Sequence, residues 1–464
     1  MNKELKQVWF EKYSKVPETL KNVKTVKKAA TAFNANVDAV LKIKPAKILK
    51  LVEQEDMSLA NIRDIRESKL KSGADVIKAV MRCFERGIAE EWLTEDVKVY
   101  DWMVANLGYD RLQMGGQGGI VSNALAMVGV QKVFVHTNSL PKLQAEQFLK
   151  RNNLVSFDEH GKVAPAYKID RALDLPLIHW IIEFDKGDKI EIEGVEIVCP
   201  KSNRFIATYD PLNLNLVMDE NFVKSMTKKK MDYIVLSGFH ALSSDMNGVD
   251  IVDDAVPVVE KWKKDNTIMH LELASTQDIK VRKAIVEKVA PMAESLGANE
   301  REVIDVLEVM GEKELAQSID EDTHSVSLFK GLYKMKQKIK SPRIQLHMFG
   351  LYIVIQDKGF RISPEANLRG MAMAATAAAS KAGTGAVVKP KDVLWAHGRE
   401  VSDVGLKEIM SLAEFFGDDD FAKNGIFEYK GYDVIAVPTI LIDKPVTLVG
   451  MGDTISSMSL ISAR

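Results

Sequence analysis

Short apolar runs rich in β-branched residues alternate along this chain with segments of helical periodicity. The predicted strands are "AATAFN" (29–34), "KVFVHTN" (132–138), "DYIVLSGF" (232–239), "TIMHLELAS" (267–275), "IQLHMFGLYIVI" (344–355) and "YDVIAVPTILI" (432–442). The main predicted helices are 118–129, 258–265, 281–297, 370–385 and 406–417. This alternation predicts an α/β fold with a mostly parallel central sheet flanked by helices.

The segment 179–210 has a different pattern, in which apolar and polar residues alternate with a period of two. Its "GD" and "EG" pairs are typical turn signals, so the segment predicts antiparallel hairpins. We expect these hairpins to form a separate small sheet. The whole chain is therefore predicted to be a large α/β domain with a small β-sheet lid, whose strands are inserted into the domain sequence.

The composition excludes several classes of protein. Lysine and arginine total 63 and aspartate and glutamate total 65, so the net charge of −2 does not favour nucleic acid as a partner. Two cysteines, Cys83 and Cys199, cannot build a disulfide framework, which favours a reducing, cytoplasmic setting. The sequence has no run of 18 apolar residues, so neither a membrane span nor a membrane partner is expected.

The stretch "TLVGMGDTISSMS" (447–459) predicts a phosphate site although the chain has no P-loop motif. A strand is expected within "ILIDKPVTLVG" and a helix after it. Gly450 and Gly452 allow a tight turn, and the N–H groups at the start of the helix can bind an anion. Asp453 is then either a general base for a substrate hydroxyl or an N-cap of the helix.

Two further motifs predict polar sites. "GGQGG" (115–119) does not have the Rossmann spacing, so it is either a loop that binds a polyol or a tight packing turn. Asn34, Asn36 and Asp38 follow a predicted strand at the edge where ligands bind in open α/β sheets. Their carboxylate and amide groups suit sugar hydroxyls, and the alternative is a turn stabilised by the same side chains.

Acidic residues occur in "HLELAS" (270–275) and "NEREV" (299–303). Magnesium prefers oxygen ligands and keeps several waters, so one or two carboxylates suffice for a site. Spacing places Asn299 and Glu302 on one helical face. The alternatives are a buried strand whose His270 and Glu272 are satisfied within the core, and a solvated helix start at "NEREV".

Taken in order, these motifs resemble those of the archaeal ADP-dependent sugar kinases, the glucokinase and phosphofructokinase family of the ribokinase-like superfamily. The motifs are "NANVD", "GGQGG", "HWIIEF", "NRFI", "HLELAS", "NEREV" and "VGMGDTIS". The resemblance covers essentially the whole chain. It implies a ribokinase-like large domain at about 1–33, 48–88, 113–162 and 212–464, with a discontinuous β lid at about 34–47, 89–112 and 163–211.

The resemblance also implies phosphoryl transfer from MgADP to a sugar, with AMP as the second product. Another divalent cation is expected to be able to replace Mg²⁺. Arg204 is expected to contact phosphate, and its alternative role is a salt bridge within the lid. The other implied roles are the catalytic base, Asp453; the anion hole, Gly450 and Gly452; sugar contacts, Asn34, Asn36, Asp38, Gly115, Gly116, Gln117 and His179; nucleotide contacts, His347, Val437 and Gly452; and magnesium-organising residues, Glu272, Asn299 and Glu302.

The identity of the acceptor stays open at this stage. The resemblance implies that the glucokinases of this family hold a glucose hydroxyl with a lid glutamate. Glu90 and Glu91 of "GIAEEW" fall in that region, and the alternative is that they lie on a solvated hairpin. Basic residues such as Lys201 and Arg204 would instead suit the phosphate of fructose 6-phosphate. The first hypothesis is therefore an ADP-dependent phosphofructokinase for which glucose is a permitted second acceptor, and the alternative is an ADP-specific glucokinase.

Two hypotheses from other classes are an ATP-dependent ribokinase-like kinase and a non-catalytic sugar-binding sensor. Asp453, Glu272 and Glu302 together argue against the sensor, which needs neither a base nor metal-binding acids. The choice of ADP over ATP rests on the family resemblance alone. A monomer or a small homo-oligomer is expected.

Overall fold

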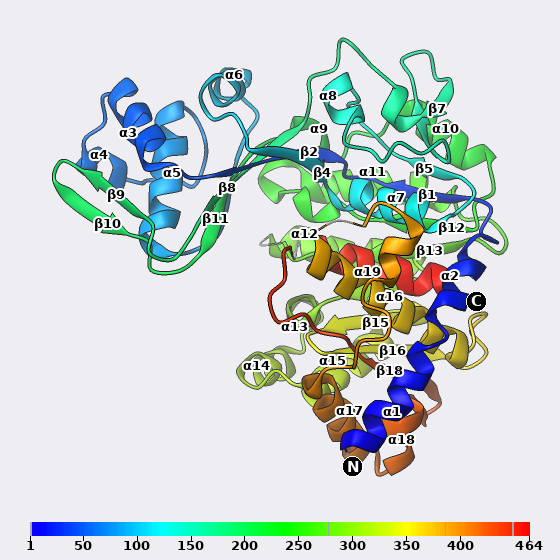
Figure 1. Ribbon diagram of the computed structural model, residues 1–464. Coiled ribbons are helices and arrows are strands. Elements are labelled where there is room, and N and C mark those ends of the chain that lie inside the picture. The colour runs from blue at the N-terminus through cyan, green and yellow to red at the C-terminus, as the bar shows by residue number, and fades with distance from the viewer. Residues whose placement is uncertain (1, 277, 386, 448–449) are drawn as a thin grey trace.

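The computed structural model describes residues 2–276, 278–385, 387–447 and 450–464. It contains a large α/β domain and a lid, which extends to the left of the large domain in Figure 1. We use "lid" for residues 36–115 and 178–209, which surround the smaller sheet. Each part has its own hydrophobic core, so the two parts are separate packing units.

An 11-stranded sheet organises the described part of the large domain. From β15 to β6 neighbouring strands are parallel, whereas β16, β18, β17 and β7 pair antiparallel at the two ends, so the predicted mostly parallel sheet is confirmed. Its central strands are buried along their whole length, which explains why they are continuous apolar runs. In spatial order the strands are β17 (Ile426–Tyr429), β18 (Tyr432–Pro438), β16 (Leu351–Asp357), β15 (Arg343–Met348), β14 (Ser295–Ala298), β13 (Ile268–Glu272), β12 (Tyr233–Leu236), β1 (Ala29–Ala32), β5 (Val133–Val135), β6 (Leu154–Phe157) and β7 (Val163–Pro165).

Helices flank this sheet. The alanine-rich segment forms α16, which packs along α19 and ends at Gly385, as predicted. No helix among the described residues is long and apolar enough to span a membrane. The helices of the large domain are α1 (Asn2–Tyr13), α2 (Val16–Val23), α7 (Gln117–Val128), α8 (Lys142–Ala145), α9 (Pro211–Leu214), α10 (Glu220–Lys228), α11 (Gly248–Glu260), α12 (Ile279–Ala284), α13 (Glu300–Val309), α14 (Lys313–Glu321), α15 (Ser325–Lys338), α16 (Pro364–Thr384), α17 (Asp403–Phe416), α18 (Asp419–Asn424) and α19 (Met451–Ser462).

The lid is a five-stranded sheet covered on one face by helices. The predicted hairpins are confirmed, since β8 pairs antiparallel with β11 and β9 with β10. The sheet order is β3 (Glu90–Thr94), β11 (Asn203–Tyr209), β8 (Ile178–Phe184), β2 (Asn36–Lys42) and β4 (Arg111–Gly115). The other lid elements are β9 (Lys189–Ile192), β10 (Val195–Val198), α3 (Pro45–Gln54), α4 (Leu59–Arg63), α5 (Gly73–Arg86) and α6 (Val97–Asn106).

The two faces of the lid sheet differ in character. Trp92, Trp180 and Phe205 lie on the face that packs against the lid helices, and each is at most 2% exposed. Side chains alternate along a strand, so the residues between them project from the opposite face. That opposite face carries Glu91 and Arg204, which are polar and exposed.

The division into two cores corrects the predicted domain boundaries. Residues 48–88, predicted in the large domain, form α3, α4 and α5, and their apolar faces pack into the lid core. A one-sided sheet must bury its apolar face against other elements, and these helices supply the cover. Residues 163–177 were predicted in the lid, but β7 belongs to the large sheet, and Ala166 and Ile169 lie in the large core.

Several element predictions were wrong in detail. The helix expected at 281–297 gives way to a short turn at Pro291 and then to β14, because proline cannot continue a helix. The run 344–355 forms two antiparallel strands separated at Gly350. The helix expected at 258–265 is instead the end of α11, which stops at Glu260. No strand forms in the described residues of 440–450, and Leu448 and Val449 lie outside them.

Candidate active site

A cleft of about 960 Å³ lies between the lid and the large domain. It brings together residues from six segments that are far apart in the sequence. The predicted site residues that line it are Asn34, Asn36, Asp38, Glu90, Glu91, Gly116, Gln117, His179, Arg204, Gly450 and Asp453. Chain segments that cross from the central sheet into the lid therefore converge with the start of α19.

Asp453 lies in the first turn of α19, at its third residue, and is not the N-cap. Gly450 is the N-cap, with a left-handed φ of +62°. Because the helix begins at Met451, the N–H groups of its first turn have no acceptor within the helix and can bind an anion. Gln117, the first residue of α7, donates a hydrogen bond from Nε2 to Asp453 Oδ1 at 2.7 Å. Two helix N-termini thus meet beside the carboxylate.

The electrostatic surroundings of Asp453 favour a base. Burial raises the pKa of its carboxyl, although the hydrogen bond from Gln117 and the charge of Lys381 act in the opposite direction. A carboxylate with a raised pKa is a stronger proton acceptor than a solvated one. The predicted anion hole and the predicted base are therefore adjacent at one helix start.

The asparagines of "NANVD" form the floor of the cleft next to "GGQGG". Asn36 Nδ2 donates to Asp38 Oδ1 at 3.0 Å. An added Cβ at Gly116, where φ is +71°, would lie 2.6 Å from Asn36 Oδ1 and 2.7 Å from Asn34 Oδ1, so only glycine fits there. Both amide oxygens are buried and have no hydrogen-bond partner among the described residues. Unpaired buried acceptors at a cleft are suited to ligand hydroxyl groups.

His179 of β8 adds a positive charge to the same cleft. Its Nε2 lies 3.0 Å from Asp210 Oδ2. Burial lowers the pKa of His179, but Asp210, with Glu91 and Asp38 nearby, outweighs it and raises the pKa to about 9. Asp210 caps α9 and was missed in the sequence, where its position before Pro211 at the end of a strand was the available signal.

The structure separates the two lid glutamates. Glu90 accepts hydrogen bonds from Arg82 Nε and Trp92 Nε1, both at 2.9 Å, so its carboxylate is occupied within the lid. Glu91 accepts a bond from Thr208 Oγ1 at 2.6 Å on the face that carries His179. Glu91 is thus the better candidate for contact with a sugar.

The residues predicted for magnesium also lie close together. Asn299 is the N-cap of α13, and Glu302 reaches back to it, with Glu302 Oε2 accepting from Asn299 N at 2.8 Å. Glu272, at the end of β13, is 5% exposed. An added Cβ at Gly297 of the neighbouring strand β14 would lie 2.0 Å from Glu272 Oε2. Gly297, missed in the sequence, therefore makes the space for this carboxylate.

Three acidic side chains, those of Glu272, Glu302 and Asp453, interact with one another beside the predicted magnesium site. Burial, with the charges of Asp453 and Glu302, raises the pKa of Glu272 well above its usual range. Burial likewise raises the pKa of Glu302 to about 8, with Asp453 contributing. No lysine or arginine of the described chain lies within 4 Å of either glutamate carboxylate. Buried oxygen donors without a cationic partner fit a divalent cation.

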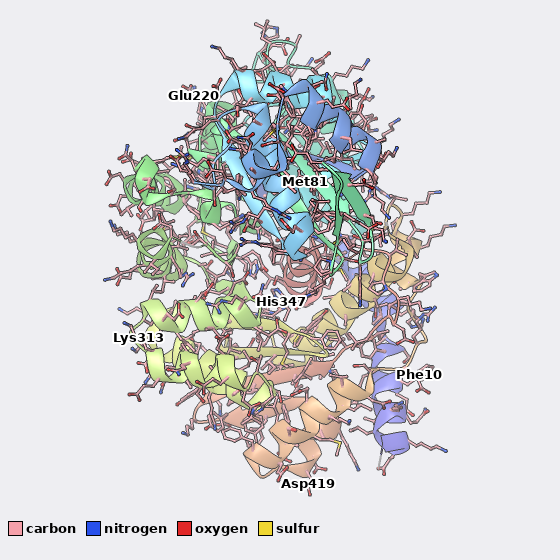
Figure 2. The ribbon with its side chains drawn as sticks, turned by 90° about the vertical axis from the view of Figure 1, so that its left-hand side faces the viewer. Phe10, Met81, Glu220, Lys313, His347 and Asp419 are labelled. Atoms are coloured by element: carbon pink, nitrogen blue, oxygen red, sulfur yellow. The ribbon has the colours of Figure 1, made fainter. Side chains whose placement is uncertain are left out.

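The histidines near Glu272 are neutral. Burial lowers the pKa of His347 to about 4 and that of His270 to about 3. His270 Nε2 lies 3.1 Å from Glu272 Oε2, and His347 Nε2 lies 3.7 Å from Glu272 Oε1. His347 Nδ1 also lies 3.3 Å from Ser456 Oγ. In Figure 2, His347 lies near the middle of the molecule, below the lid. His347 is therefore placed beside the acids.

Val437 does not reach the cleft. It is fully buried in β18, opposite Tyr352 of β16. The assignment of His347 and Val437 to a nucleotide pocket stays a prediction. Cleft residues that the sequence did not single out include His240, Ser275, Thr276 and Asp278. They follow β12 and β13, so the signal available was their place after predicted parallel strands.

Comparison with known proteins agrees with this geometry. A family model described as the ADP-specific Phosphofructokinase/Glucokinase conserved region matches residues 27–462. The chain belongs to this family. The ADP-dependent glucose/glucosamine kinase of Pyrococcus furiosus is 30% identical over 464 residues, with 98% of each chain covered. The ADP-specific phosphofructokinase of Methanosarcina acetivorans is 28% identical, covering 93% of this chain and 92% of the relative.

Solved structures of the ADP-dependent kinases share the fold. The last common ancestor of ADP-dependent phosphofructokinases from Methanosarcinales has a TM-score of 0.86 and 30% identity, covering 100% of this chain and 98% of that chain. An ADP-dependent kinase in complex with fructose-6-phosphate and ADPβS has a TM-score of 0.81 and 29% identity, covering 98% and 97%. The predicted membership in this ADP-dependent kinase family and the ribokinase-like fold with a lid are confirmed.

For this family member, we expect Glu302→Gln to become stabilising as the pH rises in the absence of divalent cations. The pKa of Glu302 is about 8 when folded and 4.5 ordinarily. Between those values the folded chain holds a proton that the unfolded chain releases, so rising pH lowers the free energy of unfolding. Glutamine does not ionise and avoids this loss.

The measurement is thermal unfolding of wild type and Glu302→Gln with a chelator at pH 5 and pH 8. The melting-temperature difference between them should grow in favour of the variant at pH 8. Glu314→Gln, on the exposed surface of α14, is the control and should show no such growth. A difference that is equal at both pH values would contradict the raised pKa.

Proposed function

We propose that the protein transfers the β-phosphoryl group of MgADP to fructose 6-phosphate, giving fructose 1,6-bisphosphate and AMP. The observation that carries this proposal is the placement of Asp453 beside the N-termini of α7 and α19, in a cleft whose other wall is the polar face of the lid. Membership in the ADP-specific phosphofructokinase/glucokinase family supports ADP as the donor.

The residues have distinct tasks in the transfer. Asp453 accepts the proton of the attacking hydroxyl, and the hydroxyl oxygen bonds to the β-phosphorus as the bond from that phosphorus to the oxygen of AMP breaks. The N–H groups at the start of α19 stabilise the charge of the transferring group. Asn34, Asn36 and Asp38 orient the sugar hydroxyls, so that the attacking oxygen is held in position.

Glu272 and Glu302 are the residues that would hold Mg²⁺, and Asn299 caps α13, the helix that carries Glu302. Among the described residues, no three His, Cys, Asp or Glu side chains form a preformed metal site. This agrees with an ion that takes its remaining ligands from water and substrate phosphate. When bound, Mg²⁺ would supply charge neutralisation at the donor phosphates.

The lid face favours a sugar phosphate and allows glucose. Arg204 lines the cleft and has no ion-pair partner in the described part of the chain, so its guanidinium is free to bind a phosphate. Glu91, on the adjacent strand β3, is placed to accept a hydrogen bond from a sugar hydroxyl. The family contains relatives of both names, so glucose is the second acceptor to test.

The function is tested by crossing ADP or ATP with fructose 6-phosphate or glucose in four assays. Turnover with ADP and fructose 6-phosphate is expected to be the fastest. Turnover with ATP but not with ADP would favour an ordinary ribokinase-like kinase. Turnover with glucose but not with fructose 6-phosphate would favour the glucokinase alternative. Absence of turnover in all four assays would support a sugar-binding sensor.

Charge at the lid face predicts how the acceptors can be separated. We expect Arg204→Gln to raise the KM for fructose 6-phosphate by about 10–100-fold, the equivalent of one charge-assisted hydrogen bond, and to leave glucose kinetics nearly unchanged. Glu91→Gln should have the larger effect on glucose. Arg111→Gln is the matched control, since it also removes an arginine of the lid, one whose guanidinium lies 3.7 Å from the Glu183 carboxylate. Equal effects of Arg204→Gln on both sugars would contradict a phosphate contact.

A further inference from the structure

Lys381 of α16 reaches the start of α19 from outside the predicted motifs. Its Nζ donates to Gly450 O at 3.3 Å and to Thr454 Oγ1 at 3.5 Å. The Gly450 carbonyl also accepts from Thr454 N at 3.3 Å and from Thr454 Oγ1 at 2.7 Å. Three donors therefore converge on the N-cap carbonyl of the helix that carries Asp453.

Lys381 lies in the last turn of its own helix α16, where a cation is favourable, but it is unfavourable for the stability of α19, whose start it contacts. The N-terminus of a helix is its positive end, so a cation there is repelled rather than attracted. Within the described residues, no carboxylate lies within 4 Å of Lys381 to offset this cost. Burial also lowers the pKa of Lys381, although the charge of Asp453 opposes the shift. Its placement therefore needs an explanation other than the stability of α19.

The charges that face Asp453 supply that explanation. Glu272 of β13 and Glu302 of α13 are the carboxyl groups that interact electrostatically with Asp453, and both are buried. Gln117 of α7 donates a hydrogen bond but is neutral. Among the described groups that affect Asp453, Lys381 is the cation, and its charge lowers the pKa of that carboxyl.

We propose that Lys381 is a positioning residue for phosphoryl transfer: it fixes the Gly450 carbonyl, and with it the N–H groups of the anion hole, and it balances the charge that gathers around Asp453. This inference rests on the proposed kinase function. It assigns a role to a residue outside the motifs that carry the family resemblance.

A second cavity makes the inference testable by chemical rescue. Lys381 and Thr454 line a cavity of about 410 Å³, together with apolar side chains that include Ile120, Met127 and Met458. Truncating Lys381 to alanine would extend this space to the Gly450 carbonyl. A small ammonium ion such as methylammonium or ethylammonium could then enter and replace the lost Nζ.

The first experiment compares Lys381→Met, Lys381→Arg and wild type in the ADP-dependent assay. Lys381→Met should lower kcat by about 10²-fold, the scale expected when a reacting group is misplaced, with a smaller change in the KM for the sugar. The acidic limb of its kcat–pH profile should move to higher pH, because loss of a positive charge raises the pKa of Asp453. Lys381→Arg, which keeps the charge, should retain more activity.

The second experiment adds methylammonium or ethylammonium to Lys381→Ala and Lys381→Met. Activity should rise with ammonium concentration in the alanine variant but not in the methionine variant, whose side chain fills the space. Lys150→Met, which changes another lysine that lines the same cavity, should behave as wild type. Thermal unfolding of each variant shows whether it is folded.

The outcomes separate the two claims. A Lys381→Met enzyme with wild-type kcat and pH profile would overturn the inference. So would a loss of kcat with no shift of the acidic limb and no rescue of Lys381→Ala, because that combination indicates a purely structural role. If wild type itself shows no ADP-dependent turnover, the proposed function fails first, and this result is distinct from either of those.

Discussion

Replacing Asp453 by asparagine is expected to lower kcat by about 10²–10⁴-fold, the usual contribution of a general base. Asparagine keeps the shape of the side chain and a carbonyl oxygen that can accept the 2.7 Å hydrogen bond from Gln117 Nε2, so the helix start should stay folded. Affinity for ADP should change little, because the anion hole consists of backbone N–H groups. Steady-state kinetics and direct measurement of ADP binding check the two parts of the prediction.

Asp443→Asn is the matched control for Asp453. Asp443 precedes the same helix on an exposed segment, so its substitution should leave kcat at the wild-type value. Asp453→Ala should lose at least as much activity as the asparagine variant. If either variant at Asp453 retains more than a tenth of the wild-type kcat, Asp453 is not the base.

Gly297→Ala should have the second largest effect, through a residue that contacts no substrate in our proposal. Its new Cβ would lie 2.0 Å from Glu272 Oε2 and 2.5 Å from Ser456 Oγ, closer than non-bonded atoms can approach. Both partners are buried, so the Glu272 carboxylate must move. If Glu272 organises Mg²⁺, kcat at low Mg²⁺ should fall by about 10–100-fold, the usual effect of removing a group that orients a metal ligand.

A magnesium titration of activity measures this effect, and circular dichroism confirms that the variant is folded. Glu272→Gln should shift the titration in the same direction. Because both substitutions act on one carboxylate, the double variant should lose less than the sum of the two single losses in free energy. A Gly297→Ala enzyme with the wild-type magnesium dependence would show that Glu272 does not organise the metal.

The sequence patterns were sufficient to predict the large sheet, because its central strands are buried on both faces. Runs such as "DYIVLSGF" and "TIMHLELAS" are continuous apolar segments and became β12 and β13. The grouping of the motif residues in one cleft could also be predicted, since the carboxyl ends of parallel strands share one edge. Asn34, Asp38, Gln117 and Asp453 accordingly lie in one cleft.

Other features depend on contacts that a single sequence does not show. Glu90 and Glu91 are adjacent in the chain, and only the register of β3 on β11 tells which one faces His179. In the sequence, Gly297 resembles an ordinary strand glycine. The structure shows that the Glu272 carboxylate fills the space that a side chain at position 297 would need. The domain boundaries failed for a similar reason, because the amphipathic helix α5 can cover either sheet and its partner is set by tertiary packing.

The alternation of the lid strands has a practical consequence for protein engineering. On β8 and β11, residues that line the cleft alternate with residues that pack against the lid helices. A library restricted to cleft-facing positions such as Glu91, Arg204 and Ile206 would therefore vary acceptor choice while the lid core keeps its packing. In our proposal the base and the anion hole lie at the start of α19, whose buried residues belong to the core of the large domain, so new acceptors could be selected without changing them.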